Sequence, residues 1–185
     1  MTRLIAGAAG GRRLSVPPGN STRPTSDRAR EGLFGTILSE LGSLDGRKVL
    51  DLYAGSGAVG LEALSRGAGE VTLVESDARA AGVIQANIRS VGLPGATVVT
   101  SRVERFLSGP RGPYDLVFAD PPYALTAEEI TQVLIRLTEG WLAAGALVVV
   151  ERATRSGDLD WPPGYMPGKS RRYGEASFWY GWHGE

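Results

Sequence analysis

Residues 47–60 read RKVLDLYAGSGAVG, and this stretch predicts how the chain folds. Residues 47–54 are predicted to form a buried strand, and the glycines lead into a helix over 58–66. Gly55 and Gly57 permit a tight turn and let a ligand approach the main chain. The amino terminus of the helix offers N–H groups and a partial positive charge to an anionic group. The stretch therefore predicts a strand, a loop and a helix that bind a ligand.

The alternation of strand and helix continues along the chain. Further strands are predicted at 70–77, 96–101, 114–120 and 146–151, and helices at 26–41, 78–91, 102–108 and about 127–140. Strands separated by helical stretches indicate an α/β fold with a parallel sheet that is covered on both faces. The strand predicted at 175–182 follows a loop rich in Gly, Pro and Asp at 156–170, so we expect it to pair antiparallel.

The amino-terminal segment differs from this pattern. Residues 3–16 predict a β-hairpin and 17–24 a loop, so we expect an arm at 1–24 and an α/β domain at 25–185. The first 30 residues contain one acidic residue and six arginines, namely Arg3, Arg12, Arg13, Arg23, Arg28 and Arg30. This excess of positive charge predicts an arm that meets phosphates.

The composition excludes several classes of protein. The 185 residues include no cysteine and one histidine, His183, and the formal net charge is zero. A disulfide scaffold, a thiolate metal site and a cysteine nucleophile are thereby excluded, and no metal is expected. No apolar run reaches the ~20 residues of a membrane span, and no signal peptide is visible, so we expect a cytoplasmic protein that does not bind a membrane.

Two acids near the glycines indicate the kind of ligand. The spacing Gly55-x-Gly57-x-x-Gly60 also occurs in dinucleotide-binding proteins. The carboxylate of Asp51, however, would repel a pyrophosphate and suits an amine beside a sulfonium. Glu75 ends the second strand, at the spacing at which an acid accepts hydrogen bonds from ribose hydroxyls. Asp77 is the alternative, although a helix N-cap fits it better.

The tetrad Asp120-Pro121-Pro122-Tyr123 ends a strand at the carboxyl edge, where open α/β sheets bind ligands. The two prolines fix φ and remove two N–H donors. The Asp120 carboxylate and the Pro121 carbonyl can then accept hydrogen bonds from a planar exocyclic amine. The ring of Tyr123 offers a face to a flipped-out base. A plain Pro-Pro loop is the alternative interpretation.

Together these motifs resemble those of S-adenosylmethionine-dependent amino-methyltransferases. The stretch RPTSDRAREGLF at 23–34 narrows the resemblance to the RsmD family, which methylates N2 of one guanine in small-subunit (16S) ribosomal RNA. The resemblance covers nearly the whole chain. It implies a Rossmann-like class I fold with a seven-stranded, mostly parallel sheet in the order 3-2-1-4-5-7-6. It also implies S-adenosyl-L-methionine as cofactor and small-subunit rRNA as partner. We expect a monomer that acts on rRNA within an assembled or assembling 30S subunit, and the residues leave naked rRNA open as the alternative.

The same resemblance implies roles for individual residues. Glu75 would bind the ribose of the cofactor, and Arg102 and Val103 would contact its adenine. The methionine end would contact Asp51, Tyr53, Gly55, Ser56 and Gly57. Asp120, Pro121, Pro122 and Tyr123 would hold the guanine, with Asp120 also beside the cofactor, and the arginines of the arm would hold the rRNA.

We expect the enzyme to accelerate the reaction by positioning the exocyclic amine of the target base. The lone pair of an exocyclic amine is delocalised into the ring, and acceptors at Asp120 and Pro121 would draw the N–H groups out of conjugation and aim it. No strong general base is needed, because the ammonium product is very acidic.

Other functions remain open from the residues alone. Methylation of adenine N6 or cytosine N4 in DNA is disfavoured because no target-recognition domain is visible. A small-molecule or protein-glutamine methyltransferase is disfavoured by the basic arm. A nicotinamide-dependent oxidoreductase is disfavoured by Asp51 and the tetrad, and a non-catalytic RNA-binding module by the intact acids.

Overall fold

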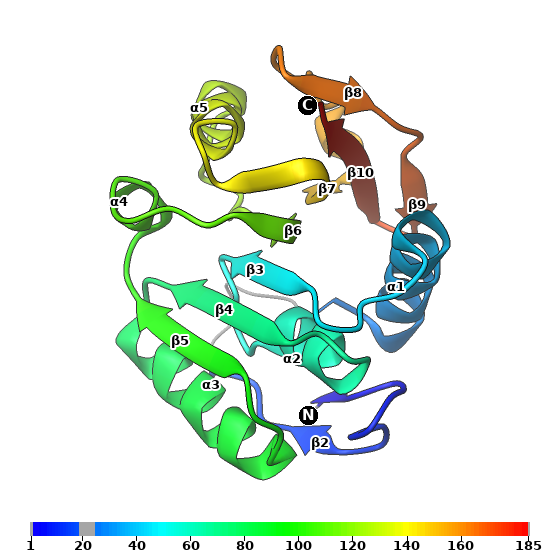
Figure 1. Ribbon diagram of the computed structural model, residues 1–185, viewed down its shortest axis with the longest axis vertical. Helices are drawn as coiled ribbons and strands as arrows, with labels where there is room; N and C mark the ends of the chain where they lie inside the picture. Colours follow the sequence, from blue (N-terminus) through cyan, green and yellow to red (C-terminus); the bar gives the residue numbers. More distant parts are fainter. Residues whose placement is uncertain (1, 19–24, 185) are drawn as a thin grey trace.

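Residues 2–18 and 25–184 are described by the computed structural model, in which helices cover both faces of one large sheet (Figure 1). The helices are α1 (Asp27–Leu41), α2 (Ala58–Ser65), α3 (Ala78–Val91), α4 (Val103–Phe106) and α5 (Ala127–Leu137), with a 3-10 turn, η1 (Thr154–Ser156). The strands of the sheet are β3 (Lys48–Leu52), β4 (Glu70–Glu75), β5 (Ala96–Thr100), β6 (Tyr114–Ala119), β7 (Leu142–Ala153), β8 (Tyr165–Pro167), β9 (Arg171–Tyr173) and β10 (Ala176–His183). A separate hairpin consists of β1 (Thr2–Arg3) and β2 (Arg13–Leu14).

The sheet has the strand order β5-β4-β3-β6-β7-β10-β8, and β9 pairs with β10 outside this path. The strands from β5 to β7 are parallel, and β10 runs antiparallel to β7. The predicted order and the antiparallel last strand are thereby confirmed. The region 156–170, which the sequence presents as a loop, contains β8, and β9 is an eighth strand. Both are three residues long and mostly exposed, so they lack the apolar alternation that would predict them.

Two hydrophobic cores lie on the two faces of the sheet, because successive side chains of a strand point to opposite faces. Val49 and Phe118 belong to the core under α1, α2 and α3. Leu50 and Val117, one residue away in the same strands, belong to the core under α4 and α5. Both faces of the central strands are therefore buried, and these strands reach the surface at their carboxyl ends.

The helices begin where the sequence places polar caps. The Ser26 hydroxyl accepts a hydrogen bond from the Ala29 amide at 3.1 Å and starts α1. Thr126 and Glu129 form a capping box at the start of α5. The helix predicted at about 127–140 ends at Leu137, and the other predicted helices agree with the structure to within two residues at either end.

The amino-terminal hairpin is packed against the helices rather than separate from them. Leu4 and Leu14 are buried in the core that also contains α1, α2 and α3. The Glu62 carboxylate of α2 accepts hydrogen bonds from the amides of Ile5 at 2.8 Å and Ala6 at 3.1 Å. The predicted boundary at residue 24 lies outside the described residues and stays a prediction. Within the described ranges, no helix is long and apolar enough to cross a membrane.

Candidate active site at the carboxyl edge of the sheet

The loop between β3 and α2 has an unusual backbone. Tyr53, Gly55 and Gly57 have φ values of 59°, 60° and 82°. This left-handed region costs glycine little, whereas it strains a bulky residue such as Tyr53. Gly57 is the N-cap of α2 and supplies no side-chain cap. A Cβ placed on Gly55 would have no atom within 4 Å, so the loop leaves open space beside its backbone.

Asp51 lies behind this loop. Its side chain is buried, and its Oδ2 accepts a hydrogen bond from the Gly60 amide at 2.9 Å. Burial raises the pKa of Asp51 to about 8, against the opposing effect of the Gly60 hydrogen bond, and the nearby charges of Glu75 and Glu151 raise it further. Asp51 therefore anchors the first turn of α2, and its ionised form is costly in this environment.

Glu75 lies next to the glycine loop, as its spacing from Gly55 predicts. One carboxylate oxygen accepts from the Gly55 amide at 2.8 Å, and the other from the Asp77 amide at 2.9 Å. The Asp77 carboxylate is instead the N-cap of α3 and accepts from the Ala80 amide at 3.1 Å. Of the two acids that the sequence leaves open for the ribose, Glu75 is thus the one beside the loop.

Arg102 and Val103 follow the neighbouring strand, β5. The Ser101 amide donates to the Glu75 carbonyl at 3.0 Å, which brings this segment beside Glu75. The Arg102 side chain is exposed and lies 3.8 Å from the Glu104 carboxylate, and Val103 is buried. The main chain of this segment is thus held beside Glu75, whereas the Arg102 head group lies beside Glu104.

The tetrad follows β6, the strand on the other side of β3. Asp120 is half-buried, and burial raises its pKa well above the usual range, with further increases from Glu151 and Asp51. Tyr123 is 74% exposed, and the guanidinium of Arg155 lies 5.3 Å from its ring centroid. The site thus combines half-buried acceptors with an exposed aromatic face.

Glu151 belongs to this site, although the sequence analysis did not single it out. In the parallel pairing of β6 with β7, Ala119 lies opposite Val150, so the next residues, Asp120 and Glu151, are neighbours. Burial raises the pKa of Glu151 as well. A signal was present, because β3, β4, β6 and β7 all carry an acid at or near the end of an apolar run.

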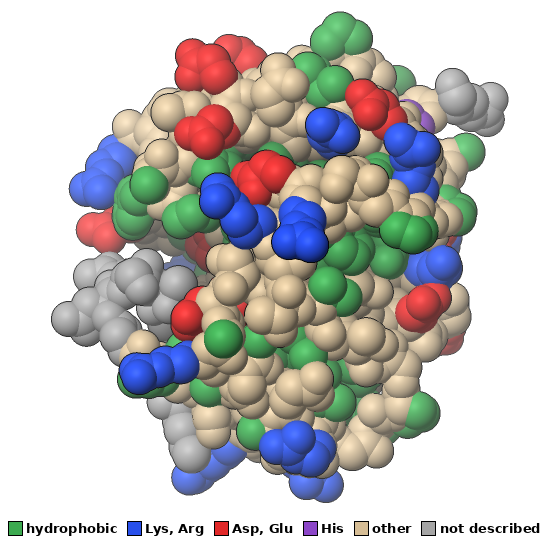
Figure 2. Space-filling model, turned by 90° about the vertical axis from the view of Figure 1, so that its left-hand side faces the viewer, with side chains coloured by type: hydrophobic (Ala, Val, Ile, Leu, Met, Phe, Trp, Pro, Cys, Tyr) green, Lys and Arg blue, Asp and Glu red, His purple; other side chains and the backbone are tan. Residues whose placement is uncertain are grey.

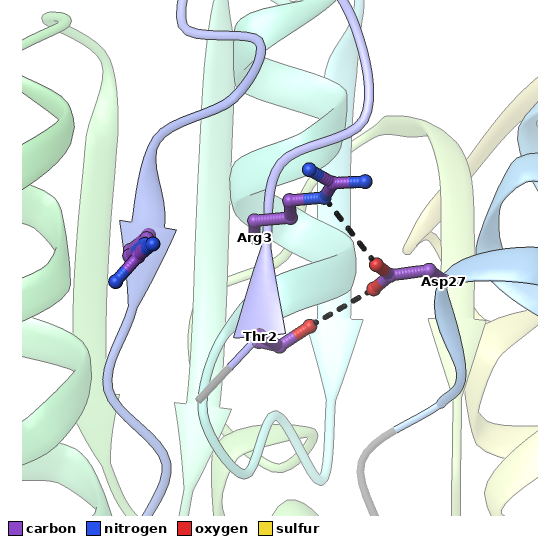
Figure 3. A pocket seen from close by; sticks show the side chains of 4 residues that line it. Thr2, Arg3 and Asp27 are labelled. Carbon is purple, nitrogen blue, oxygen red and sulfur yellow. Dashed lines mark hydrogen bonds and ion pairs between the residues drawn. The ribbon is translucent and has the colours of Figure 1, made fainter.

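The arginines of the arm fall into separate groups. Arg3, Arg12, Arg13 and Arg28 are exposed, and Arg23 lies outside the described residues. Thr2, Arg3, Arg13 and Asp27 line a pocket in which Thr2 and Arg3 both point toward Asp27 (Figure 3). The Arg3 Nε atom is 3.6 Å from Asp27 Oδ2, and the Thr2 hydroxyl donates to Oδ1 at 3.3 Å. Figure 2 shows basic and acidic side chains interspersed on one face of the molecule.

The structure corrects the prediction that Arg30 contacts RNA. Its side chain is completely buried, and its Nε lies 3.3 Å from Glu62 Oε1. Its Nη2 donates to Asp27 Oδ1 and to the backbone carbonyl of Arg3, and its Nη1 donates to the Thr2 hydroxyl and the Thr25 carbonyl. The charge of Arg30 is therefore used inside the protein, where α1 packs on α2, and does not reach a phosphate.

Comparisons with known proteins give matches over nearly the whole chain. The family model described as conserved hypothetical protein 95 matches residues 2–182. The chain is 36% identical over 176 residues to ribosomal RNA small subunit methyltransferase D of Escherichia coli strain K12, covering 95% of this chain and 87% of that one. It superposes on the E. coli protein yhhF with a TM-score of 0.86 and 32% identity, covering 98% and 97% of the two chains. A hypothetical protein of Thermus thermophilus gives a TM-score of 0.81 and 36% identity, with coverage of 97% and 98%.

Proposed function

Because the chain belongs to the RsmD family of ribosomal RNA small subunit methyltransferases, we propose that it methylates the exocyclic N2 of a guanine in 16S rRNA with S-adenosyl-L-methionine. The membership agrees with the resemblance carried by residues 23–34. The observation that carries the proposal is the position of Asp120 and its tetrad beside the Asp51–Gly60 loop, across the paired strands β3 and β6.

The loop fits the proposed cofactor in three respects. The space beside Gly55 is open, the amino terminus of α2 has no side-chain cap, and Glu75 presents a half-buried carboxylate next to the loop. S-adenosyl-L-methionine supplies an electrophilic methyl group on a positively charged sulfur. The acidic surroundings of Asp51, Glu75 and Asp120 favour a cation over a pyrophosphate, which would be repelled here. Tyr53, Gly55, Ser56 and Gly57 would lie at its methionine end, and Arg102 and Val103 at its adenine.

The tetrad would hold the target base. The Asp120 carboxylate and the Pro121 carbonyl accept hydrogen bonds from the exocyclic amine, and Tyr123 stacks on the ring. Pro122 has no backbone N–H, so it adds no hydrogen-bond donor to this turn. The two acceptors turn the amine so that its lone pair points away from ring conjugation. We assign the rate acceleration to this positioning, since loss of one preorganised group typically costs ~10²–10³ in rate.

The partner and setting extend the same proposal. A base that is to be methylated must leave its stack, so an rRNA loop in an assembled or assembling 30S subunit suits the site better than a duplex. The exposed Arg3, Arg12, Arg13 and Arg28 would meet phosphates. We further propose that the enzyme acts as a monomer in the cytoplasm.

Methyl transfer to unmodified small subunits tests this function. Small subunits from cells that lack this enzyme are incubated with labelled S-adenosylmethionine, and the methylated base is mapped. We expect label on N2 of a guanine with the wild-type chain and none with Asp120→Ala. Asp120→Asn keeps an acceptor oxygen and should retain measurable activity. Equal inactivity of the two folded, cofactor-bound variants would contradict catalysis by positioning, and a lack of label with the wild type would overturn the function.

A further inference from the structure

Three acids meet on one face of the sheet at the carboxyl ends of adjacent strands. Asp51 lies opposite Phe118 in the pairing of β3 with β6, and Phe118 lies opposite Val149 in the pairing of β6 with β7. Asp120, directly after β6, and Glu151, within β7, each stand two residues further along the chain, and side chains two apart in extended backbone share a face. Glu151 is therefore beside Asp120 and on the same side of the sheet.

The Glu151 carboxylate is oriented from the segment before α1. The Thr25 hydroxyl donates a hydrogen bond to Oε1 of Glu151 at 2.8 Å. Within the part of the chain that the structure describes, this is the one hydrogen bond to the carboxylate, and Oε2 accepts none. Glu151 is half-buried, so one oxygen is held in place and the other remains available at the site.

The acceptors of the tetrad cannot by themselves distinguish guanine from adenine. Asp120 and the Pro121 carbonyl recognise an exocyclic amine, and guanine N2 and adenine N6 are both such amines. The ring position beside the amine differs, because guanine N1 carries a hydrogen and donates, whereas adenine N1 has a lone pair and accepts. A second group next to Asp120 is thus needed to select the base.

We propose that Glu151 is this group, and that its carboxylate accepts a hydrogen bond from N1–H of the target guanine and excludes adenine. This inference rests on the function proposed above. A carboxylate cannot donate to adenine N1, and the two lone pairs repel each other. The N–H groups of guanine bond to the charged forms of Asp120 and Glu151 and offset the cost of holding two carboxylates together. Thr25 acts as a positioning residue, because it holds the Glu151 carboxylate.

A direct test compares the two bases at the target position. Unmodified small subunits are prepared with the natural guanine and with an adenine in its place, and transfer of labelled methyl to each is measured. The proteins are the full-length wild type, Glu151→Gln, Thr25→Val and Glu139→Gln. Glu139 is an exposed acid just after α5, at the opposite edge of the sheet, and serves as the matched control.

Glu151→Gln should lower the ratio of the guanine rate to the adenine rate about tenfold or more, because the N1–H of guanine loses a charged acceptor. The glutamine amide can donate to adenine N1, so the adenine rate should rise above that of the wild type. Thr25→Val should lower the ratio in the same direction but less, and Glu139→Gln should leave it unchanged. A purely structural role would change both rates together and leave the ratio as it is.

An unchanged ratio in folded Glu151→Gln overturns the inference. If Glu151→Gln fails to bind S-adenosylhomocysteine in calorimetry, Thr25→Val decides in its place, and an unchanged ratio there overturns the inference equally. A wild type that labels neither base would instead overturn the proposed function. A wild type that labels guanine, with ratios insensitive to Glu151 and Thr25, removes this inference and leaves that function standing.

Discussion

Arg30 and Glu62 form an ion pair in which both side chains are completely buried, with 3.3 Å between Nε and Oε1. Arg30 comes from α1 and Glu62 from α2. Glu62 also pairs with Arg66 at 2.9 Å, and Arg30 donates to the backbone of Arg3 in the hairpin. One pair of opposite charges thus ties the amino-terminal hairpin and two helices together.

Arg30→Met should lower the free energy of unfolding by about 3–5 kcal/mol, because it breaks a buried ion pair and removes the fully buried one of the two arginines that pair with Glu62. Arg28→Met is the matched control, since Arg28 is exposed on the same helix, and it should change stability by no more than ~0.5 kcal/mol. Urea unfolding measures both values. Binding of rRNA at several salt concentrations should show the opposite pattern, with Arg28→Met reducing the salt slope by ~0.7–0.9 and folded Arg30→Met leaving it unchanged. A reduced slope for Arg30→Met without loss of stability would mean that Arg30 reaches a phosphate.

Glu75→Ala should weaken binding of S-adenosylhomocysteine, since the ribose would lose a charged acceptor worth ~1.5–3 kcal/mol. Asp77→Ala removes the N-cap of α3 and should instead cost ~0.5–2 kcal/mol of stability with little change in affinity. Calorimetry and urea unfolding on both variants separate the two effects. Weaker binding in Asp77→Ala alone would reverse the assignment of the two acids.

Tyr123→Ala should raise the KM for small subunits by roughly tenfold, because stacking of a base on an aromatic ring is worth ~1–3 kcal/mol. Tyr123→Phe keeps the ring and should behave nearly like the wild type. The exposure of this ring means that neither change should alter stability much. Steady-state methyl transfer checks the prediction, and equal defects in the two variants would show that the hydroxyl, rather than the ring, matters.

Stability should fall as the pH rises between about 4 and 8, owing to Asp51. Burial raises its pKa in the folded protein from 3.8 to about 8, so in this range the folded state holds a proton that the unfolded state has released. The contribution of Asp51 to the free energy of unfolding is therefore fully present below pH ~4. It decreases by up to ~1.4 kcal/mol for each pH unit as the pH rises toward ~8. Asp51→Asn keeps an acceptor for the Gly60 amide and should flatten this slope. Urea unfolding from pH 5 to 8 compares the two proteins, and parallel curves would contradict the prediction.

The hairpin shows why truncation is a poor test of RNA binding by the arm. Leu4 and Leu14 fill the core beneath α1 and α2, so deleting the arm would uncover apolar surface as well as remove arginines. Substitution of exposed arginines changes the charge alone.

The sequence by itself determined the α/β fold class and the edge of the sheet at which the candidate site lies, and the family resemblance implied the strand order. Short, largely apolar runs such as 48–54, bounded by glycines and separated by helical stretches, predict buried strands, and the glycines at 55 and 57 and the tetrad at 120–123 mark where two of them end. In a parallel sheet those ends meet at one edge, so the local pattern was enough to bring Asp51, Glu75 and Asp120 together. The capping residues Ser26 and Thr126 likewise act within a few residues of themselves.

Only the tertiary structure decided which charged side chains are exposed and which are paired inside the protein. Arg28 and Arg30 differ by two positions and look alike in sequence, yet one is exposed and the other meets Glu62, 32 residues away. Glu151 and Thr25 are 126 residues apart, and no local pattern pairs them. Burial and ion pairing depend on contacts between distant segments, and these form only when the sheet and its helices pack.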